Sequence, residues 1–168
     1  MPPTFDTVYA ATQRDVYALC RHLVGNAADA QDATQETFLA VAGALPGFRG
    51  EASVKTWVHR IAIRCALKIR AKSRRAPEPL PAAELPGERD PRVDSERSWA
   101  LARAMAELSF EQRAVISLFA IEGLTHAEIA EVLGVPEGTV WSRLHAVRKR
   151  LAALLTDGST LESARALA

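Results

Sequence analysis

Apolar side chains recur every three or four residues along most of the chain, which is the spacing of one face of an α-helix. One stripe occupies residues 5–23, a second begins near Asp29 and stops before Pro46, and a third runs from residue 54 to about 74. Aromatic residues are few while Ala and Leu are abundant, which favours helices over strands. The pattern therefore predicts an all-α fold.

The second half of the chain adds shorter helices with clear start signals. Ser109 with Gln112 and Thr125 with Glu128 are capping boxes, in which the two side chains satisfy backbone N–H groups of a first helical turn. They predict helices over residues 110–122 and 125–133, preceded by a helix over residues 95–108. Beyond residue 155 the tail is polar at first and weakly helical, and we expect it to fray.

Residues 125–151 have the pattern of a helix-turn-helix. Gly134 suits the left-handed backbone of the turn, and Pro136 suits the first turn of the next helix. That next helix has one buried stripe, made of Val140, Leu144, Val147 and Leu151. No acid occurs in residues 138–155, so its other faces are basic and suited to phosphates and a major groove. The alternative is an ordinary helical hairpin with a solvated basic face.

The net charge of +1 conceals a separation of charge along the chain. Residues 55–75 hold eight Lys or Arg and no acid, whereas residues 78–96 hold six acids and two arginines. Five of the nine prolines lie in residues 76–92 and indicate a semi-stiff linker. We therefore predict two small helical domains, residues 1–75 and 95–157, with a Pro-rich linker over 76–94 and a tail over 158–168.

The first domain has two surfaces with open interpretations. On the helix that begins near Asp29, an acidic stripe includes one apolar residue, Leu39, so it is either a solvated face or a protein-binding face. On the basic helix predicted from residue 54 to about 74, positive charges recur along one side. Nearby Trp57, His59 and Phe48 would suit the binding of unpaired DNA, because aromatic rings can stack on its bases. Core packing is the alternative for Trp57 and for Phe48.

Enzyme and metal signatures are missing from the sequence. Cys20 and His22 point to different sides of a helix, and His59 with Cys65 also lacks zinc-site spacing. There is no Gly-rich phosphate loop or nucleophile signature, so we expect no catalytic residues, no metal and no cofactor. Two cysteines, no long apolar run and no signal-peptide layout lead us to expect a cytoplasmic protein without membrane insertion.

The order of these parts resembles a bacterial sigma factor of the extracytoplasmic-function (ECF, group 4) family. The resemblance rests on DAQDATQETFLAVAGAL, PGFRGEASVKTW, HRIAIRCALKIRAKSRR and GTVWSRLHAVRKRL, in that order, and covers roughly residues 5–155. It implies a region 2-like three-helix domain, a region 4-like helix-turn-helix domain, and partners that include core RNA polymerase and promoter DNA. An anti-sigma protein is a further partner that the family implies.

The resemblance also assigns roles to particular residues. The residues that match surfaces for the polymerase largest and second-largest subunits are Asp32, Gln35, Glu36, Leu39 and Phe119. Those that match the segment for the −10 element and its melted strand are Phe48, Arg49, Gly50, Glu51, Ser53, Trp57, Arg60, Arg64 and Lys68. Those that match the −35 reading helix are Thr139, Trp141, Ser142, Arg143, His145, Ala146, Arg148 and Lys149.

Trp141 and Ala146 depart from the commoner pattern, because many relatives have basic residues there. Fewer phosphate contacts, or an apolar contact with a thymine methyl group, would follow. The rival interpretation is a ligand-responsive helix-turn-helix regulator. It would need an apolar sensor pocket and a dimer seam, neither of which the sequence indicates, and it would leave residues 55–75 without a purpose.

Overall fold

The computed structural model describes residues 3–73 and 103–165, and side chains as far as residue 154. Six α-helices and a short 3-10 helix have defined bounds, residues 103–106 are also helical, and the described residues include no strand. The predicted all-α fold is confirmed. The predicted linker, most of the expected helix 95–108 and the last three residues lie outside the described residues.

Helices α1 (Phe5–Val24), α2 (Ala27–Ala44) and α3 (Val54–Ser73) pack on one another as the first unit. Gly25 ends α1 with a left-handed φ of 91°, and Asn26 caps α2 by accepting the backbone N–H of Asp29. Helix α2 therefore begins two residues before the predicted start near Asp29, because the Asn26 side chain supplies the cap. The 3-10 helix η1 (Leu45–Gly47) closes this helix at Pro46.

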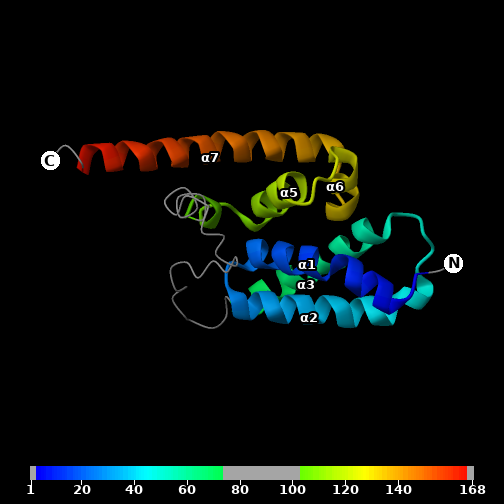
Figure 1. Ribbon diagram of the computed structural model, residues 1–168. Coiled ribbons are helices and arrows are strands. Elements are labelled where there is room, and N and C mark those ends of the chain that lie inside the picture. Colours follow the sequence, from blue (N-terminus) through cyan, green and yellow to red (C-terminus); the bar gives the residue numbers. More distant parts are fainter. Residues whose placement is uncertain (1–2, 74–102, 166–168) are drawn as a thin grey trace.

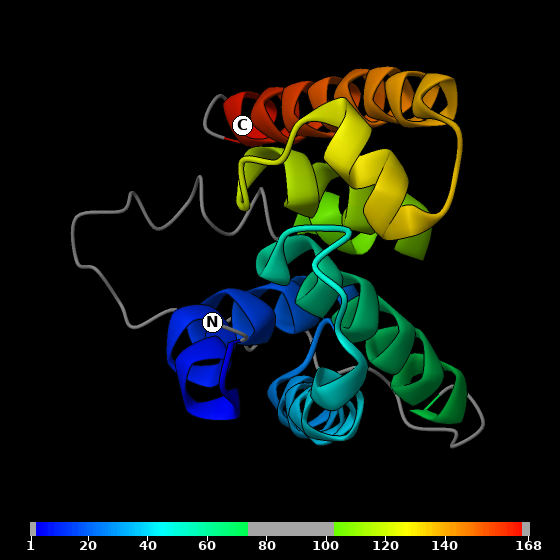
Figure 2. The ribbon, with the colours of Figure 1, turned by 90° about the vertical axis from the view of Figure 1, so that its right-hand side faces the viewer.

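Helices α5 (Phe110–Ala120), α6 (His126–Leu133) and α7 (Glu137–Arg165) form the second unit. In Figure 1, α7 lies along the top, α5 and α6 lie beneath it, and α1, α2 and α3 form the bottom. The turned view in Figure 2 shows the same stacking, with the second unit seated on the first. The contacts between the units are made mainly by α1 with α5 and by α3 with α6.

One apolar core runs through both units. Its largest fully buried side chains come from all six α-helices with defined bounds, and include Leu19, Val41, Val58, Leu118, Ile129 and Leu144. The expected stripe of the reading helix is confirmed, since Val140, Leu144 and Val147 are buried and Leu151 is half-buried. The two units thus bury apolar faces against each other as well as internally.

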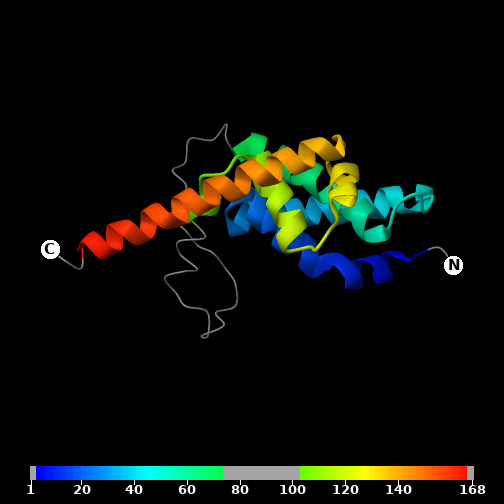
Figure 3. The same ribbon diagram turned by 90° about the horizontal axis from the view of Figure 1, so that it is seen from above.

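Helix α7 is longer than expected. It continues without a break to Arg165, so the tail that the sequence led us to expect to fray is part of it. Figures 1 and 3 show its C-terminal half extending past the ends of the other helices. No helix in the described ranges combines the length and apolar character needed to cross a bilayer.

Candidate nucleic-acid interface

The turn between α6 and α7 sets the reading helix in place. Thr125 accepts the backbone N–H of Glu128, and Glu128 accepts that of Thr125, so the predicted capping box is present. The same backbone contact holds the pKa of Glu128 below its usual value. Gly134 ends α6 with a left-handed φ of 64°, where a side chain would be strained. Pro136 lies one position before α7, and its carbonyl accepts the N–H of Thr139.

The open face of α7 carries the residues that the sequence assigns to DNA. Its exposed members are Trp141, Ser142, His145, Ala146, Arg148 and Lys149, while Thr139 and Arg143 are half-buried. Val140, Leu144 and Val147 point to the opposite, buried side. Within the described part of the chain, Arg143 and Lys149 form no ion pair with an acid. This face is therefore basic, solvated and free to approach a phosphate backbone.

A row of flat side chains crosses this face. The rings of His126 and Trp141 stack with centroids 4.1 Å apart and planes within 10° of parallel. The Phe119 ring is tilted by 35° to that of His126 with centroids 5.3 Å apart, and the Arg148 guanidinium lies 5.1 Å from the centroid of the Phe119 ring. Phe119 thus packs within its own domain and is half-buried.

In the first unit, two contacts hold the loop before α3: a helix cap and a contact between two aromatic rings. Ser53 accepts the backbone N–H of Thr56 at 3.0 Å and so caps α3, as predicted. Phe48 packs against Trp57 with ring centroids 4.9 Å apart, and both rings are half-buried. Arg49, Gly50 and Glu51 are exposed, which leaves the tip of the loop free.

The basic side of α3 is only partly open. Arg64 and Lys68 are exposed, and Lys68 lies 3.9 Å from Glu36 of α2. Arg60 is half-buried, because its Nη2 donates to Oε1 of Glu131 on α6 at 2.9 Å. Arg60 and Arg64 line a groove of about 380 Å³ whose other wall comes from residues 131–134.

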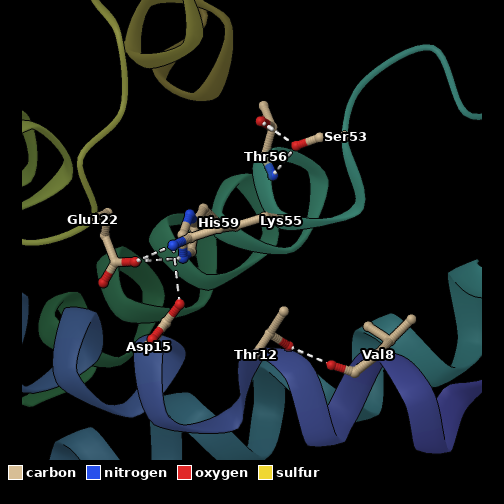
Figure 4. A network of polar contacts seen from close by, with 8 residues as sticks. All are labelled: Val8, Thr12, Asp15, Ser53, Lys55, Thr56, His59 and Glu122. Atoms are coloured by element: carbon tan, nitrogen blue, oxygen red, sulfur yellow. Dashed lines mark hydrogen bonds and ion pairs between the residues drawn. The ribbon is translucent and has the colours of Figure 1, made fainter.

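A polar network joins α1, α3 and the turn that follows α5 (Figure 4). The Lys55 ammonium lies 3.0 Å from Asp15 and 3.2 Å from Glu122, and His59 Nε2 lies 3.5 Å from Glu122. Burial opposes the charge of Lys55, but its contacts with the two carboxylates outweigh this and raise its pKa. Burial raises the pKa of Glu122, whose side chain is only 3% exposed.

His59 is fully buried in this arrangement, so here it is not available to unpaired DNA. Burial, followed by the nearby charge of Lys55, lowers the pKa of His59 to about 4. The imidazole is therefore neutral near pH 7, and Lys55 rather than His59 is the cation that balances Glu122. Sequence spacing missed the network because Asp15, Lys55, His59 and Glu122 meet only through the contact between the two units.

The sequence also did not predict that residues of this network could form a metal site. Asp15, His59 and Glu122 offer ligand atoms within 4.8 Å of one another, a donor set that could hold a divalent ion. However, the Lys55 ammonium lies between the two carboxylates and already supplies the positive charge there. The residues therefore fit an ion-pair network better than a metal centre.

The acidic stripe of α2 lies on the surface, as its pattern indicated. Asp32, Gln35, Glu36 and Leu39 are all exposed, and Leu39 is 62% exposed. Beside it, an apolar groove of about 380 Å³ between α1 and α2 is lined by Phe5, Tyr9, Phe38 and Leu39 among others. An acidic face with an apolar anchor suits a protein partner with a basic surface.

Cys20 and Cys65 are free thiols. Burial raises the pKa of Cys20 to about 12 and also raises the pKa of Cys65. Burial therefore favours the protonated thiol at both positions.

Taken together, the helix-turn-helix with an open basic face and the three-helix unit with an acidic face define a two-part DNA-binding protein that also docks on another protein. Family comparisons agree with this class. Residues 8–76 match "Sigma-70 region 2" and residues 98–151 match "Sigma-70, region 4". The ECF RNA polymerase sigma factor SigM of Mycobacterium tuberculosis is 34% identical over 151 residues, which are 90% of this chain and 76% of that protein.

The ECF RNA polymerase sigma factor SigE of Mycolicibacterium smegmatis is 35% identical over 165 residues, covering 94% of this chain and 64% of that protein. Among solved structures, CnrH in complex with the cytosolic domain of CnrY superimposes with a TM-score of 0.69 at 25% identity, over 91% of this chain and 88% of that chain. The sigma factor RpoE of Bartonella quintana shares the fold, with a TM-score of 0.77 over 90% of this chain and 96% of that chain.

The chain belongs to the ECF family of RNA polymerase sigma factors. It directs RNA polymerase to promoters, and the ligand-responsive regulator is not favoured.

Proposed function

We propose that the two units divide promoter recognition as the family resemblance implies, with residues 95–157 on the −35 element and residues 1–75 on the −10 element. The observation that carries this proposal is that helix α7 has two different sides. One side is buried, and the other is open and carries no acid. Its first two turns would enter the major groove, where base edges are distinguishable. Arg143, Ser142 and Trp141 are then the side chains for base contact, and Arg148 and Lys149 those for phosphates.

In the first unit, the exposed loop residues 49–51 would capture an unstacked base of the −10 element, while Trp57 and Phe48 form its floor. Extruding a base costs a few kcal/mol, so the loop must compensate with stacking and hydrogen bonds. Support comes from the capped start of α3 at Ser53 and from the packed pair of Phe48 and Trp57, which fix the loop at one end. Arg60, Arg64 and Lys68 would hold the melted strand by its phosphates.

The α2 surface of Asp32, Gln35, Glu36 and Leu39 is the proposed contact for the polymerase largest subunit. Its exposure and its acidic charge support this role. We expect Asp32→Lys and Glu36→Lys to abolish co-purification with core enzyme while the helix content stays unchanged. Glu107→Lys is the control, because Glu107 is equally exposed but lies in the other unit. Normal co-purification of both α2 variants would remove this role.

Phe119 is proposed as part of the contact with the second-largest subunit. The side chain is half-buried between His126 and Arg148, so only part of the ring is available to a partner. The protein performs no bond chemistry in this proposal, acts in the cytoplasm, and is held by an anti-sigma protein. The last point draws on the family and on CnrH, which was solved with the cytosolic domain of a protein partner.

The experiment that tests the division of labour compares promoter binding with and without polymerase. Specific binding to duplex promoter fragments should require core enzyme, and run-off transcription from a promoter library should show a preference at both elements. Binding of a duplex operator by the isolated chain, with no effect of core enzyme, would instead indicate a regulator that acts alone.

A further inference from the structure

An exposed tryptophan on a DNA-reading helix needs an explanation. Trp141 is 56% exposed and occupies the first turns of α7, where recognition helices touch base edges. Its ring is nevertheless not free to turn, because one face stacks on His126 at 4.1 Å. His126 also contacts Phe119, and Phe119 contacts Arg148, so side chains from α5, α6 and α7 hold one another beside the indole.

The chemistry of the free face points to its ligand. The indole ring is broad and apolar, and the only apolar group that a base pair presents in the major groove is the thymine C5-methyl. A contact of this kind depends on the position of the ring, since dispersion falls off within an ångström of separation. A ring that is already immobilised also loses less rotamer entropy on binding.

We propose that Trp141 reads a thymine methyl group in the −35 element, and that His126 is a positioning residue that holds the indole plane for this contact. The proposal rests on the proposed role of α7 in −35 recognition. His126 does not touch the DNA in it; it acts only through the ring of Trp141.

The test uses holoenzyme and promoter fragments in which each −35 thymine is replaced in turn by deoxyuridine, which removes only the methyl group. At one position the wild-type protein should bind the thymine form about fourfold more tightly, the factor that burial of one methyl group contributes. Trp141→Ala should bind both forms equally. His126→Ala should lose most of the discrimination, and His126→Phe, which keeps a flat ring, should restore it.

Equal binding of both forms by the wild-type protein, at every thymine, would overturn the methyl contact. Unchanged discrimination in His126→Ala would overturn the positioning role. If −35 sequence changes of any kind left binding unaffected, the proposed role of α7 would fail as well, and that outcome is separate from the first two.

A second, independent observation is the set of ion pairs between the two units. Glu122 and Glu131, both from the second unit, contact Lys55 and Arg60 on α3. The pair between Arg60 and Glu131 is near solvent and contributes little by itself. Glu122 is almost fully buried, and removing its charge would break the ion pair that ties Lys55 to the second unit, while Asp15 of the first unit would still contact Lys55.

The arrangement is too compact for the promoter. Elements centred at −10 and −35 are separated by about 25 base pairs, or about 85 Å of duplex. A compact chain of this length has a radius of gyration of about 15 Å, so joined units cannot reach both elements. The units must separate before both elements are bound.

We infer that the joined arrangement is a conformer in which Glu122 and Glu131 occupy α3 cations in place of DNA phosphates, and that their release opens the chain. The two carboxylates act here as internal competitors of the melted strand for α3. The competition with DNA rests on the proposed role of α3. The contacts that join the two units do not depend on that role.

The test compares Glu122→Gln and Glu131→Gln with Glu107→Gln, which makes the same charge change at an exposed site that shares in none of the ion pairs described between the units. Small-angle X-ray scattering of the free chain measures the separation of the units. Fluorescence anisotropy with labelled oligothymidine measures access to α3, because stacking and backbone contacts tolerate any sequence. Circular dichroism checks that each variant is folded, and Glu131 is exposed enough for its variant to remain so.

Glu122→Gln should increase the radius of gyration and tighten oligothymidine binding about tenfold or more relative to Glu107→Gln, since a contact to a charged group of this kind shifts an equilibrium by such a factor. Glu131→Gln should show the same changes to a smaller extent. An unchanged radius would overturn the role of these carboxylates in joining the units. A larger radius without tighter binding would overturn the competition with DNA, whereas loss of promoter-directed transcription with core enzyme would concern the proposed function alone.

Discussion

Helices α3 and α7 are both basic and both carry one apolar stripe, yet the structure treats them differently. Helix α7 has a buried side and an open side, with Arg143 and Lys149 on the open side. Helix α3 is covered by α1 and α2 on one side and by α6 on another, so Arg60 is already paired and His59 is enclosed. A basic helix is therefore ready to bind DNA only where no acidic neighbour has reached it first.

The largest effect is expected on the buried side of α7. Leu144→Ala should lower the free energy of unfolding by about 2–5 kcal/mol, because it removes a fully buried side chain and leaves a cavity. Urea denaturation followed by circular dichroism measures this. Arg150→Ala on the open side is the matched control and should change it by less than about 0.5 kcal/mol. Equal losses in the two variants would contradict the division of α7 into two sides.

The next effect concerns acidification. The pKa of His59 is lowered to about 4 from its usual 6.5, so between these values the unfolded chain binds a proton that the folded chain does not. The stability that neutral His59 contributes is thus present above pH 6.5 and is lost as the pH falls toward 4, at no more than about 1.4 kcal/mol per pH unit. Glu122, with its raised pKa, works in the opposite direction.

The contribution of His59 is therefore measured as a difference. Thermal unfolding midpoints of the wild-type protein and of His59→Gln should be compared from pH 7 to pH 4, with a shallower decline in the variant. His145→Gln on the open face of α7 should decline as the wild-type protein does, since its ring is exposed. Identical profiles for all three proteins would mean that His59 is not held neutral by the fold.

A smaller effect distinguishes two kinds of residue on the open face of α7. Arg143→Ala should weaken holoenzyme binding by about 1–3 kcal/mol at one −35 base pair and relax the preference there. Lys149→Ala should weaken binding equally on all sequences and reduce the salt slope by about 1. Titrations at several salt concentrations measure both, and an equal loss on every sequence for Arg143→Ala would make it a phosphate contact.

The smallest effect is expected at the entrance of the helix-turn-helix. Thr125→Ala should cost about 1 kcal/mol of unfolding free energy, because it removes the side chain that caps α6. Lys149→Ala, which caps nothing, is the control in the same denaturation experiment. No difference between the two would mean that Glu128 alone holds the first turn.

Local signals in the sequence account for most of the fold. The capping boxes at Ser109 and Thr125, the left-handed turn at Gly134 and the buried stripe of α7 depend only on residues a few positions apart. Such features follow from backbone hydrogen bonding and helical spacing, so a single sequence suffices to predict them.

The features that the sequence could not indicate depend on contacts between distant segments. His59 looked like an exposed ring beside basic residues, but Asp15 and Glu122 reach it from far along the chain. Likewise, the polar tail gave no apolar stripe with which to predict its helix, and α7 simply continues. The role of each residue on promoter DNA remains a prediction from family resemblance and surface exposure.

The continuity of α7 has a mechanical consequence. At 1.5 Å per residue, its 29 residues form a rod about 43 Å long, with the end that is proposed to read bases at one extremity. A tilt of about 10° at that end would move the other extremity by about 8 Å. A fluorophore attached near Arg165 would therefore report how the helix is seated in the groove, far from any base it touches.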